Sequence, residues 1–214
     1  DLVSWGKMKP IVITEVIPNI IEIYSETALI ELEYTVESDI TGFTNRYKVR
    51  ECYRIRYSPN RMYLLDYQRF MDEYLNEDNI VIDNNGLRIG ILSNSDIPLT
   101  HSANGNRIVF VRNNELWLYD LVENKMTCIF TFRQKDSDYI RDTYDQHSIR
   151  ILNIDAEGNV DFMVYGYMNR GQYEGKVAVI LYEYILVDNR IEEKAYIPIE
   201  EPYQLLKENI EQFS

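Results

Sequence analysis

No arrangement of acids, bases and nucleophiles stands out as catalytic in this chain. The only histidines are His101 and His147. Asp145, His147 and Ser148 supply the residue types of a hydrolytic triad, but neighbours in sequence point poorly at one another. No Gly-x-Ser-x-Gly turn is present to expose a nucleophile. We therefore predict that the chain has no catalytic residues and is not an enzyme.

Metal-binding patterns are equally weak. The sequence contains neither a CxxC nor an HExxH motif. Asp155–Asp161 is similar to a calcium loop, but its glycine stands at the fourth position and Gly166 replaces the glutamate at the twelfth. A hairpin turn is therefore favoured there, and we predict no metal and no cofactor. Alternatively, one polar segment could bind a hard cation through the carboxylates of Asp136, Asp138, Asp142 and Asp145.

One segment carries the side chains that recognition sites use. Gly166–Gly175 is long for a hairpin connection and is bounded by glycines. Aromatic and amide side chains beside an arginine are typical of binding hot spots. The candidate partner-binding residues are Tyr167, Asn169, Arg170, Tyr173 and Glu174. The alternative is an ordered hairpin whose aromatic side chains pack on the neighbouring strand.

Composition narrows the class of partner. The 214 residues carry a net charge of −13 and are 45% hydrophobic, so the chain can bury a core. Nucleic acid and anionic membrane surfaces both require basic patches, so neither is an expected partner. No run of apolar residues is long enough to span a membrane, and we predict no direct membrane insertion. Cys52 and Cys128 could form one bridge, although two unpaired thiols are favoured.

The elements that hold these residues begin with a predicted hairpin. Apolar and charged residues alternate along Ile30–Val36 and again along Tyr47–Tyr57, as in strands with one apolar face. The outer face of the first strand is acidic and that of the second is basic, which favours cross-strand ion pairs. Glu51 falls on the apolar face, an exception that the pattern does not explain.

A helix is predicted to follow the hairpin. Ser58-Pro59 can begin a helix, with serine as the N-cap and proline at the first helical position. The apolar residues beyond it recur at helical spacing: Tyr67, Phe70, Met71, Tyr74 and Leu75. We expect this helix to dock on the apolar face of the hairpin. The first domain is therefore predicted to be a hairpin-plus-helix module of residues 1–78.

The second predicted domain, residues 79–214, consists of short strands separated by tight turns. Two short strands at Ile80–Ile82 and Leu87–Leu92 come first, and a loop or short helix separates the two sheet units that follow. The first unit is a meander and the second has four strands, before a C-terminal helix that opens at Glu201-Pro202. The predicted strands of these units are 107–112, 115–120, 126–132, 149–155, 160–167, 176–187 and 191–199.

The meander resembles one blade of TolB-type propellers. That pattern has Ser-Pro-Asp-Gly, an apolar strand, a turn, Leu-Trp-Val-Tyr-Asp, a turn and a third strand. Thr100–Phe130 matches it through Gly105, the following strand and Leu116-Trp-Leu-Tyr-Asp120, while Ser102-Ala-Asn-Gly105 departs at its two middle residues. Ile149–Ile199 is similar to a second, degenerate blade. A closed propeller typically needs at least four blades, so we predict a mainly β protein that contains an incomplete propeller.

The resemblance implies a function class. TolB-type propellers are extracytoplasmic scaffolds that bind proteins or sugars, or the lids of some serine peptidases. We therefore expect a non-catalytic binding module of a bacterial envelope protein, extracytoplasmic or at the cell surface, that recognises a protein or a glycan. The chain begins at Asp1, which favours part of a longer anchored or secreted protein. The alternatives are the propeller part of a hydrolase whose catalytic domain lies elsewhere, and a structural module that forms a homodimer.

Overall fold

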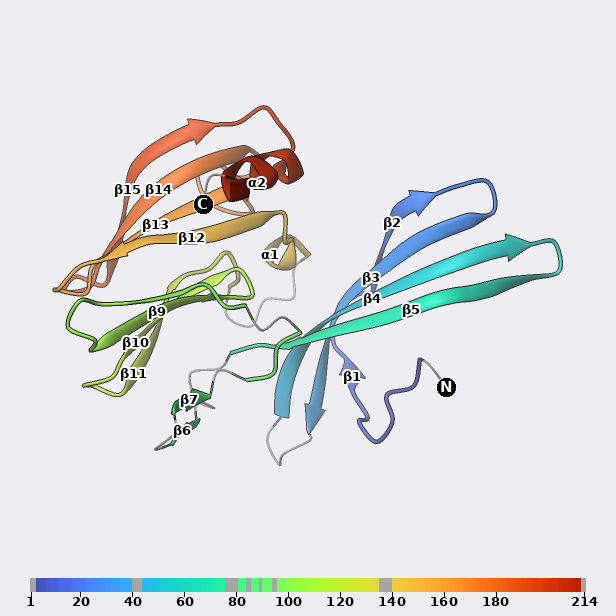
Figure 1. Cartoon of the computed structure of the whole chain (residues 1–214), viewed down its shortest axis with the longest axis horizontal. Helices are drawn as coiled ribbons and strands as arrows, with labels where there is room; N and C mark the ends of the chain where they lie inside the picture. The colour runs from blue at the N-terminus through green and yellow to red at the C-terminus, as the bar shows by residue number, and fades with distance from the viewer. Residues whose placement is uncertain are drawn as a thin grey trace. The chain divides into compact units, whose positions relative to one another are not determined.

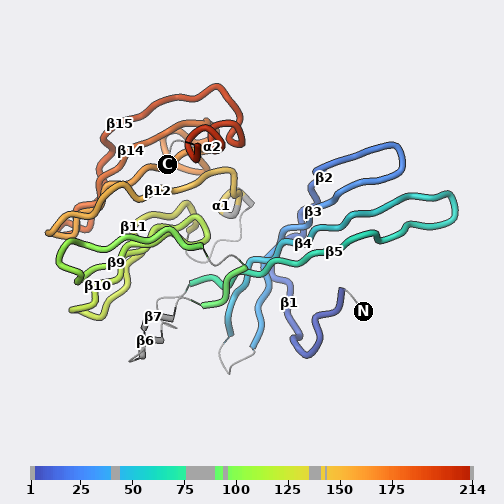
Figure 2. Tube along the Cα trace, viewed as in Figure 1, coloured from blue at the N-terminus to red at the C-terminus, as the bar shows by residue number. Residues whose placement is uncertain are grey.

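The computed structural model describes residues 3–39, 44–75, 81–83, 86–88, 90–93, 96–134 and 140–212. The chain forms two compact units, Asp1–Ser95 (unit 1) and Asp96–Ser214 (unit 2). Both are built from antiparallel sheets that do not close into a ring, as Figures 1 and 2 show. The predicted mainly β fold class is confirmed.

Unit 1 is built around two long antiparallel hairpins. Its large sheet has the order β1-β3-β4-β5, and β2 pairs with β3 beyond the end of β1. The strands are β1 (Ile11–Val12), β2 (Ile17–Ile23), β3 (Thr27–Asp39), β4 (Thr44–Ser58) and β5 (Arg61–Glu73). This sheet places one apolar face and one charged face on opposite sides.

The predicted hairpin is confirmed, including its cross-strand charges. Val36 lies opposite Tyr47 in the register of β3 and β4, and both are buried. On the other face, carboxylates of β2 and β3 pair with cations of β4. The ion pairs are Glu37–Arg46 at 2.8 Å, Glu33–Lys48 at 3.0 Å and Glu22–Arg54 at 3.2 Å. Slipping the register by one residue would bury these charges.

The predicted helix after Ser58 is wrong, because this segment is strand β5. Pro59 and Asn60 form the turn of a hairpin instead, and Ser58 lies opposite Arg61. Apolar residues in the second half of β5 fall on both faces of the sheet, since Tyr67 lies opposite Tyr53 and Phe70 opposite Arg50, so that their spacing suggests a helix. Phe70 lies on the charged face beneath the guanidinium of Arg50, 4.8 Å from the ring centre. Pairing with β4 therefore outweighs the local helical signal.

The end of β5 is tied to residues that follow the expected boundary near residue 78. The backbone N–H of Ile91 donates to the Glu73 carboxylate at 2.9 Å. The backbone N–H and the hydroxyl of Ser93 both donate to Asp72, at 2.6 Å and 2.7 Å. These bonds hold the segment up to Ser93 in unit 1. Between them lies a small hairpin, β6 (Val81–Asp83) and β7 (Gly86–Arg88), near the two strands predicted there.

Unit 2 consists of two four-stranded antiparallel sheets in which consecutive strands are neighbours. This is the strand arrangement of a propeller blade. The first sheet contains β8 (Leu99–His101), β9 (Arg107–Arg112), β10 (Glu115–Asp120) and β11 (Lys125–Phe130). The second contains β12 (His147–Ile154), β13 (Val160–Tyr167), β14 (Val177–Ile185) and β15 (Arg190–Pro198). The strands predicted for both sheets are confirmed, and β8 adds a short first strand.

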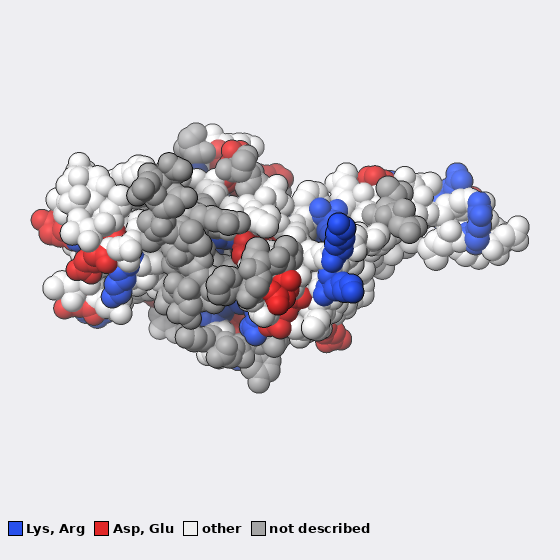
Figure 3. All heavy atoms as spheres, turned by 90° about the horizontal axis from the view of Figure 1, so that it is seen from below, with Lys and Arg blue, Asp and Glu red and all other residues white. Residues whose placement is uncertain are grey.

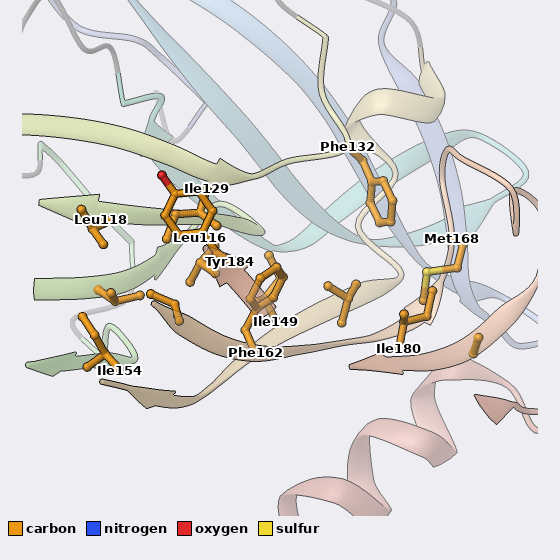
Figure 4. Packing of buried hydrophobic residues seen from close by; sticks show 14 residues of the cluster. Leu116, Leu118, Ile129, Phe132, Ile149, Ile154, Phe162, Met168, Ile180 and Tyr184 are labelled. Carbon is orange, nitrogen blue, oxygen red and sulfur yellow. The ribbon is translucent and has the colours of Figure 1, made fainter. Parts of the chain in front are cut away.

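The two sheets of unit 2 share one apolar core. Leu116 and Leu118 of the first sheet and Phe162 and Ile180 of the second are almost completely buried in it, and Figure 4 shows this packing. The predicted C-terminal helix is confirmed as α2 (Tyr203–Gln212). It packs on β13 through the buried side chains of its first turns. The short helix predicted between the sheets is α1 (Ile140–Thr143).

The two sheets repeat one turn in detail. The hydroxyl of Tyr119 donates to the side-chain oxygen of Asn124 at 2.6 Å, and that of Tyr184 donates to Asn189 at 2.9 Å. Both asparagines adopt a positive φ, of 52° and 47°. Each turn joins the third and fourth strands and has the sequence Tyr-x-Leu-Val-acid-Asn. The sequence analysis missed this repeat.

We predict that Gly166 cannot be replaced, whereas Gly171 can. Both have a positive φ, so alanine costs each about 1–2 kcal/mol of backbone strain. A Cβ at Gly166 would also lie 2.5 Å from the Gln146 carbonyl oxygen and 2.6 Å from the Tyr203 ring, whereas one at Gly171 meets nothing within 4 Å. Urea unfolding should therefore show a clearly larger loss of stability for Gly166→Ala than for Gly171→Ala. Equal losses would contradict the close packing of α2 on this strand.

Candidate functional site

The predicted binding loop is the connection between β13 and β14. In the first sheet, the equivalent connection between β9 and β10 is only Asn113-Asn114, whereas in the second it is residues 168–176. Sheets of the same design are therefore joined by a minimal turn in one case and by a long loop in the other. The loop is an addition that the strand order does not require.

The first half of the loop belongs to the core of unit 2. Met168 and Asn169 are each only 1% exposed, and the Asn169 amide donates to the Tyr144 carbonyl oxygen at 2.8 Å. Arg170 forms an ion pair with Asp142 of α1, whose carboxylate is fully buried. Deleting the whole loop would remove core side chains, so its role must be tested by substitutions in its outer half.

The outer half of the loop is held by aromatic and polar contacts. The ring of Tyr173 stacks on that of Tyr196 of β15, with centroids 3.8 Å apart. Its hydroxyl donates to Glu193 at 2.8 Å, and the Gln172 amide donates to the same carboxylate at 3.1 Å. Glu174 pairs with Arg141 of α1 at 2.8 Å. These polar groups lie at the surface, fixed in place by neighbouring strands and α1.

All five predicted binding residues thus have contacts within unit 2, since the edge of the Tyr167 ring also packs against Tyr144. The aromatic packing of the alternative interpretation is present. Sequence reasoning missed the side chains outside the loop that hold it, chiefly Asp142, Arg141 and Glu193. Asp142 was already one of the four aspartates considered as cation ligands. Its position in that polar segment is the signal that could have pointed to a charged partner.

No triad is assembled around His147. Its ring is buried and meets the edge of Phe132, with centroids 4.8 Å apart. The hydroxyl of the next residue, Ser148, lies 2.7 Å from that of Tyr203 in α2. Successive residues of strand β12 point to opposite faces, so these two side chains cannot act together.

Two of the candidate metal ligands, Asp155 and Asp142, have other roles. Asp155 accepts hydrogen bonds from the backbone of Gly158 at 2.7 Å and of Asn159 at 2.8 Å, as expected for a hairpin turn. Asp142 binds Arg170, and Asp136 and Asp138 lie outside the described residues. In the part of the chain that the structure describes, no group of three or more His, Cys, Asp or Glu side chains could hold a metal ion.

Unit 1 contains a buried carboxylate that explains the exception in the hairpin pattern. Glu51 is 3% exposed, on the apolar face of β4. It accepts hydrogen bonds from Tyr67, from Arg69 at 2.7 Å and from Tyr53 at 2.9 Å. Burial alone would raise the pKa of Glu51, but these bonds outweigh it and lower the pKa. Burial and the bond to Glu51 raise the pKa of Tyr53 to about 12, so this hydroxyl remains a donor.

Arg69 uses the same guanidinium to hold the N-terminal segment. It donates to the carbonyl oxygens of Val3 at 3.0 Å and Ser4 at 3.2 Å, and it lies 3.8 Å from the centre of the Trp5 ring. Trp5 and Met8 pack on the buried apolar residues of β3 and β4. The Glu51–Arg69 pair therefore fastens a segment that covers the inner half of the apolar face.

The outer half of that face is uncovered, and we call it the open face. It carries exposed apolar side chains on β2, β4 and β5 and half-buried ones on β3 and β4. The exposed members are Ile20, Ile23, Tyr57, Met62 and Leu64, and the half-buried members are Ile30, Tyr53 and Ile55. In Figure 3, basic side chains form separate groups over the part of the chain that holds these hairpins, and acidic side chains appear there as well.

No family model matches the sequence, and no curated protein matches it either. No disulfide joins Cys52 and Cys128. Among the described helices, none has the length and apolar character needed to cross a membrane.

We predict that the buried ion pair Asp142–Arg170 stabilises the fold far more than the exposed pair Glu174–Arg141. Asp142→Asn leaves Arg170 without its anion and should cost about 3–5 kcal/mol of unfolding free energy. Glu174→Gln breaks the exposed pair with Arg141 and should cost less than about 1 kcal/mol. Urea unfolding followed by the fluorescence of Trp117 measures both. Comparable losses would show that Asp142 does not hold the loop.

We predict that Glu51 makes unit 1 sensitive to acid. Because folding lowers the pKa of Glu51 from 4.5, its stabilisation is present above that value and is lost as the pH falls below it. Urea unfolding, followed by the fluorescence of Trp5, should show wild type more stable than Glu51→Gln at neutral pH, with the difference shrinking as the pH falls below 4.5. Glu37→Gln, on the charged face, is the control and should cost less than about 1 kcal/mol. A difference independent of pH would argue against an ionised Glu51.

Proposed function

We propose that this chain is a non-catalytic binding and scaffold module that recognises a protein ligand through the outer half of the 166–175 loop. The observation that carries the proposal is the difference between the two sheets of unit 2. Their strand order and one of their turns are repeated, yet only the second sheet has a long loop in place of the Asn113-Asn114 turn. Long ordered loops on rigid scaffolds are where binding residues concentrate.

The way in which the loop is held supports this role. Its anchor is the buried Asp142–Arg170 pair, and its surface groups are fixed by Tyr196, Glu193 and Arg141. A loop already ordered before binding loses less conformational entropy when a partner docks. The fold therefore presents Gln172, Tyr173 and Glu174 in one arrangement.

The chemistry of the loop favours a protein over a glycan. Sugars stack on open aromatic faces, and Tyr173 and Tyr196 each use one face for the other. What remains outward is an amide and charged groups of both signs, which suit polar and charged groups on a protein. A place outside the cytoplasm, within a longer envelope protein, is supported by the resemblance to TolB-type propellers.

We predict that a photoreactive amino acid at Gln172 will crosslink to a protein ligand in cells that produce the chain. Mass spectrometry should identify an adduct with a protein other than this chain. Glu174→Lys together with Tyr173→Ala should weaken binding of the identified ligand at least about tenfold, since hot-spot side chains each contribute more than about 1 kcal/mol.

The matched control carries the photoreactive residue at Val187, an 88% exposed position at the opposite end of the same sheet. Equal labelling from both positions, or none from position 172, would refute the proposal. An adduct that bears sugar residues would instead identify a glycan ligand, and an adduct of two copies of this chain would place the loop in a self-contact.

A further inference from the structure

The open face is continuous across four strands. Register places Ile23, Ala28, Ile55 and Leu64 in one row across β2, β3, β4 and β5. The adjacent row towards the centre of unit 1 contains Ile20, Ile30, Tyr53 and Tyr67, and the row nearest the hairpin turn contains Tyr57 and Met62. None of these side chains is charged. Ile23 is 72% exposed, and Tyr57 and Met62 are each 60% exposed.

The charges of these strands lie on the opposite face. There Glu22 pairs with Arg54, and Arg56 and Arg61 lie over the ring of Tyr63. An uncharged sheet face of this extent is comparable with the largest apolar patch found on monomers, and patches of that size often mark interaction sites. The inner half of the same face shows what such a surface requires, since Trp5 and Met8 cover it.

The size of the open face suits a modest interface. Four strands about 4.8 Å apart and about six residues at about 3.4 Å each give a projected area of about 400 Å². Side chains that stand out from the sheet add to this projected area. Two such faces in contact therefore bury about 800 Å² or more, at the low end of protein–protein interfaces, where weak and transient complexes are found.

The uncharged open face can meet a second copy of this chain in spite of the charge that both copies carry. With a net charge of −13, two copies repel each other over most of their surfaces. The open face is a region where they can approach without bringing like charges together. A symmetric dimer needs a surface that is complementary to itself, and two twisted apolar sheets pack face to face in this way.

We infer that the open face forms a symmetric sheet-on-sheet interface with the open face of a second copy. The dimer is reversible, because its interface is small. The interface lies in unit 1 and is independent of the loop proposed to bind a ligand, which belongs to unit 2. Each copy therefore brings its own loop to the assembly.

Sedimentation equilibrium and light scattering of the full chain test this inference. The mass should rise from one copy to two as the concentration increases from about 1 µM to about 100 µM. Two paired variants place like charges on the face: Tyr57→Asp with Met62→Asp, and Tyr57→Lys with Met62→Lys. Each variant alone should remain monomeric over this range. An equimolar mixture should form a heterodimer, because opposite charges then meet across the interface.

The matched control replaces exposed apolar residues outside the open face, Val122→Asp with Val187→Asp, at positions 73% and 88% exposed. It should dimerise like wild type. Circular dichroism spectra that match wild type show that each variant is folded. A wild type that stays monomeric at all concentrations overturns the inference, as does a dimer that the open-face variants leave unchanged. Ligand crosslinking at Gln172 is measured separately, so failure of one proposal does not affect the other.

Discussion

A sheet with one apolar face must have that face covered, and this requirement organises both units. In unit 2 the two sheets cover each other, so that Leu116, Phe162 and Ile180 are removed from water together. Helix α2 covers part of the outer side of the second sheet through Tyr203 and Leu206. In the described part of unit 1, a short N-terminal segment that contains Trp5 and Met8 covers the sheet. The inner half of its sheet is buried, whereas the outer half keeps its apolar side chains exposed.

Buried ion pairs occur where a segment must be tied to a sheet. Glu51 and Arg69 fasten the N-terminal segment, and Asp142 and Arg170 fasten the loop between β13 and β14. A buried pair adds little net stability compared with apolar residues of the same size, but losing one partner is costly. Such a pair therefore fixes one arrangement of an irregular segment. Backbone hydrogen bonds of a sheet cannot fix it, because the segment is not part of a strand.

Strands could be predicted from the sequence wherever alternation and turn residues agreed, as in β3, β4 and β9–β15. The prediction failed for β5, because apolar residues of its second half lie on both faces of the sheet and Ser58-Pro59 has the form of a helix start. The position of the loop was predicted from its glycines and its length. The residues that hold the loop were not predicted. Asp142 and Glu193 are distant from it in sequence, and nothing in their own segments indicates a partner in the loop. Glu51 was noticed as an exception, but its partners Tyr67 and Arg69 lay in the segment expected to be helical.

The repeated Tyr–Asn turn shows which parts of unit 2 are needed for the sheet itself. A hydroxyl bond to an asparagine with positive φ closes the third and fourth strands in both sheets, so this contact belongs to the common design. The loop between the second and third strands is where the two sheets diverge. A feature that one sheet has and the other lacks is not required by the strand order that they share. The buried anchor of the loop fixes a structure beyond what the strands need, and that additional order is what supports recognition as its role.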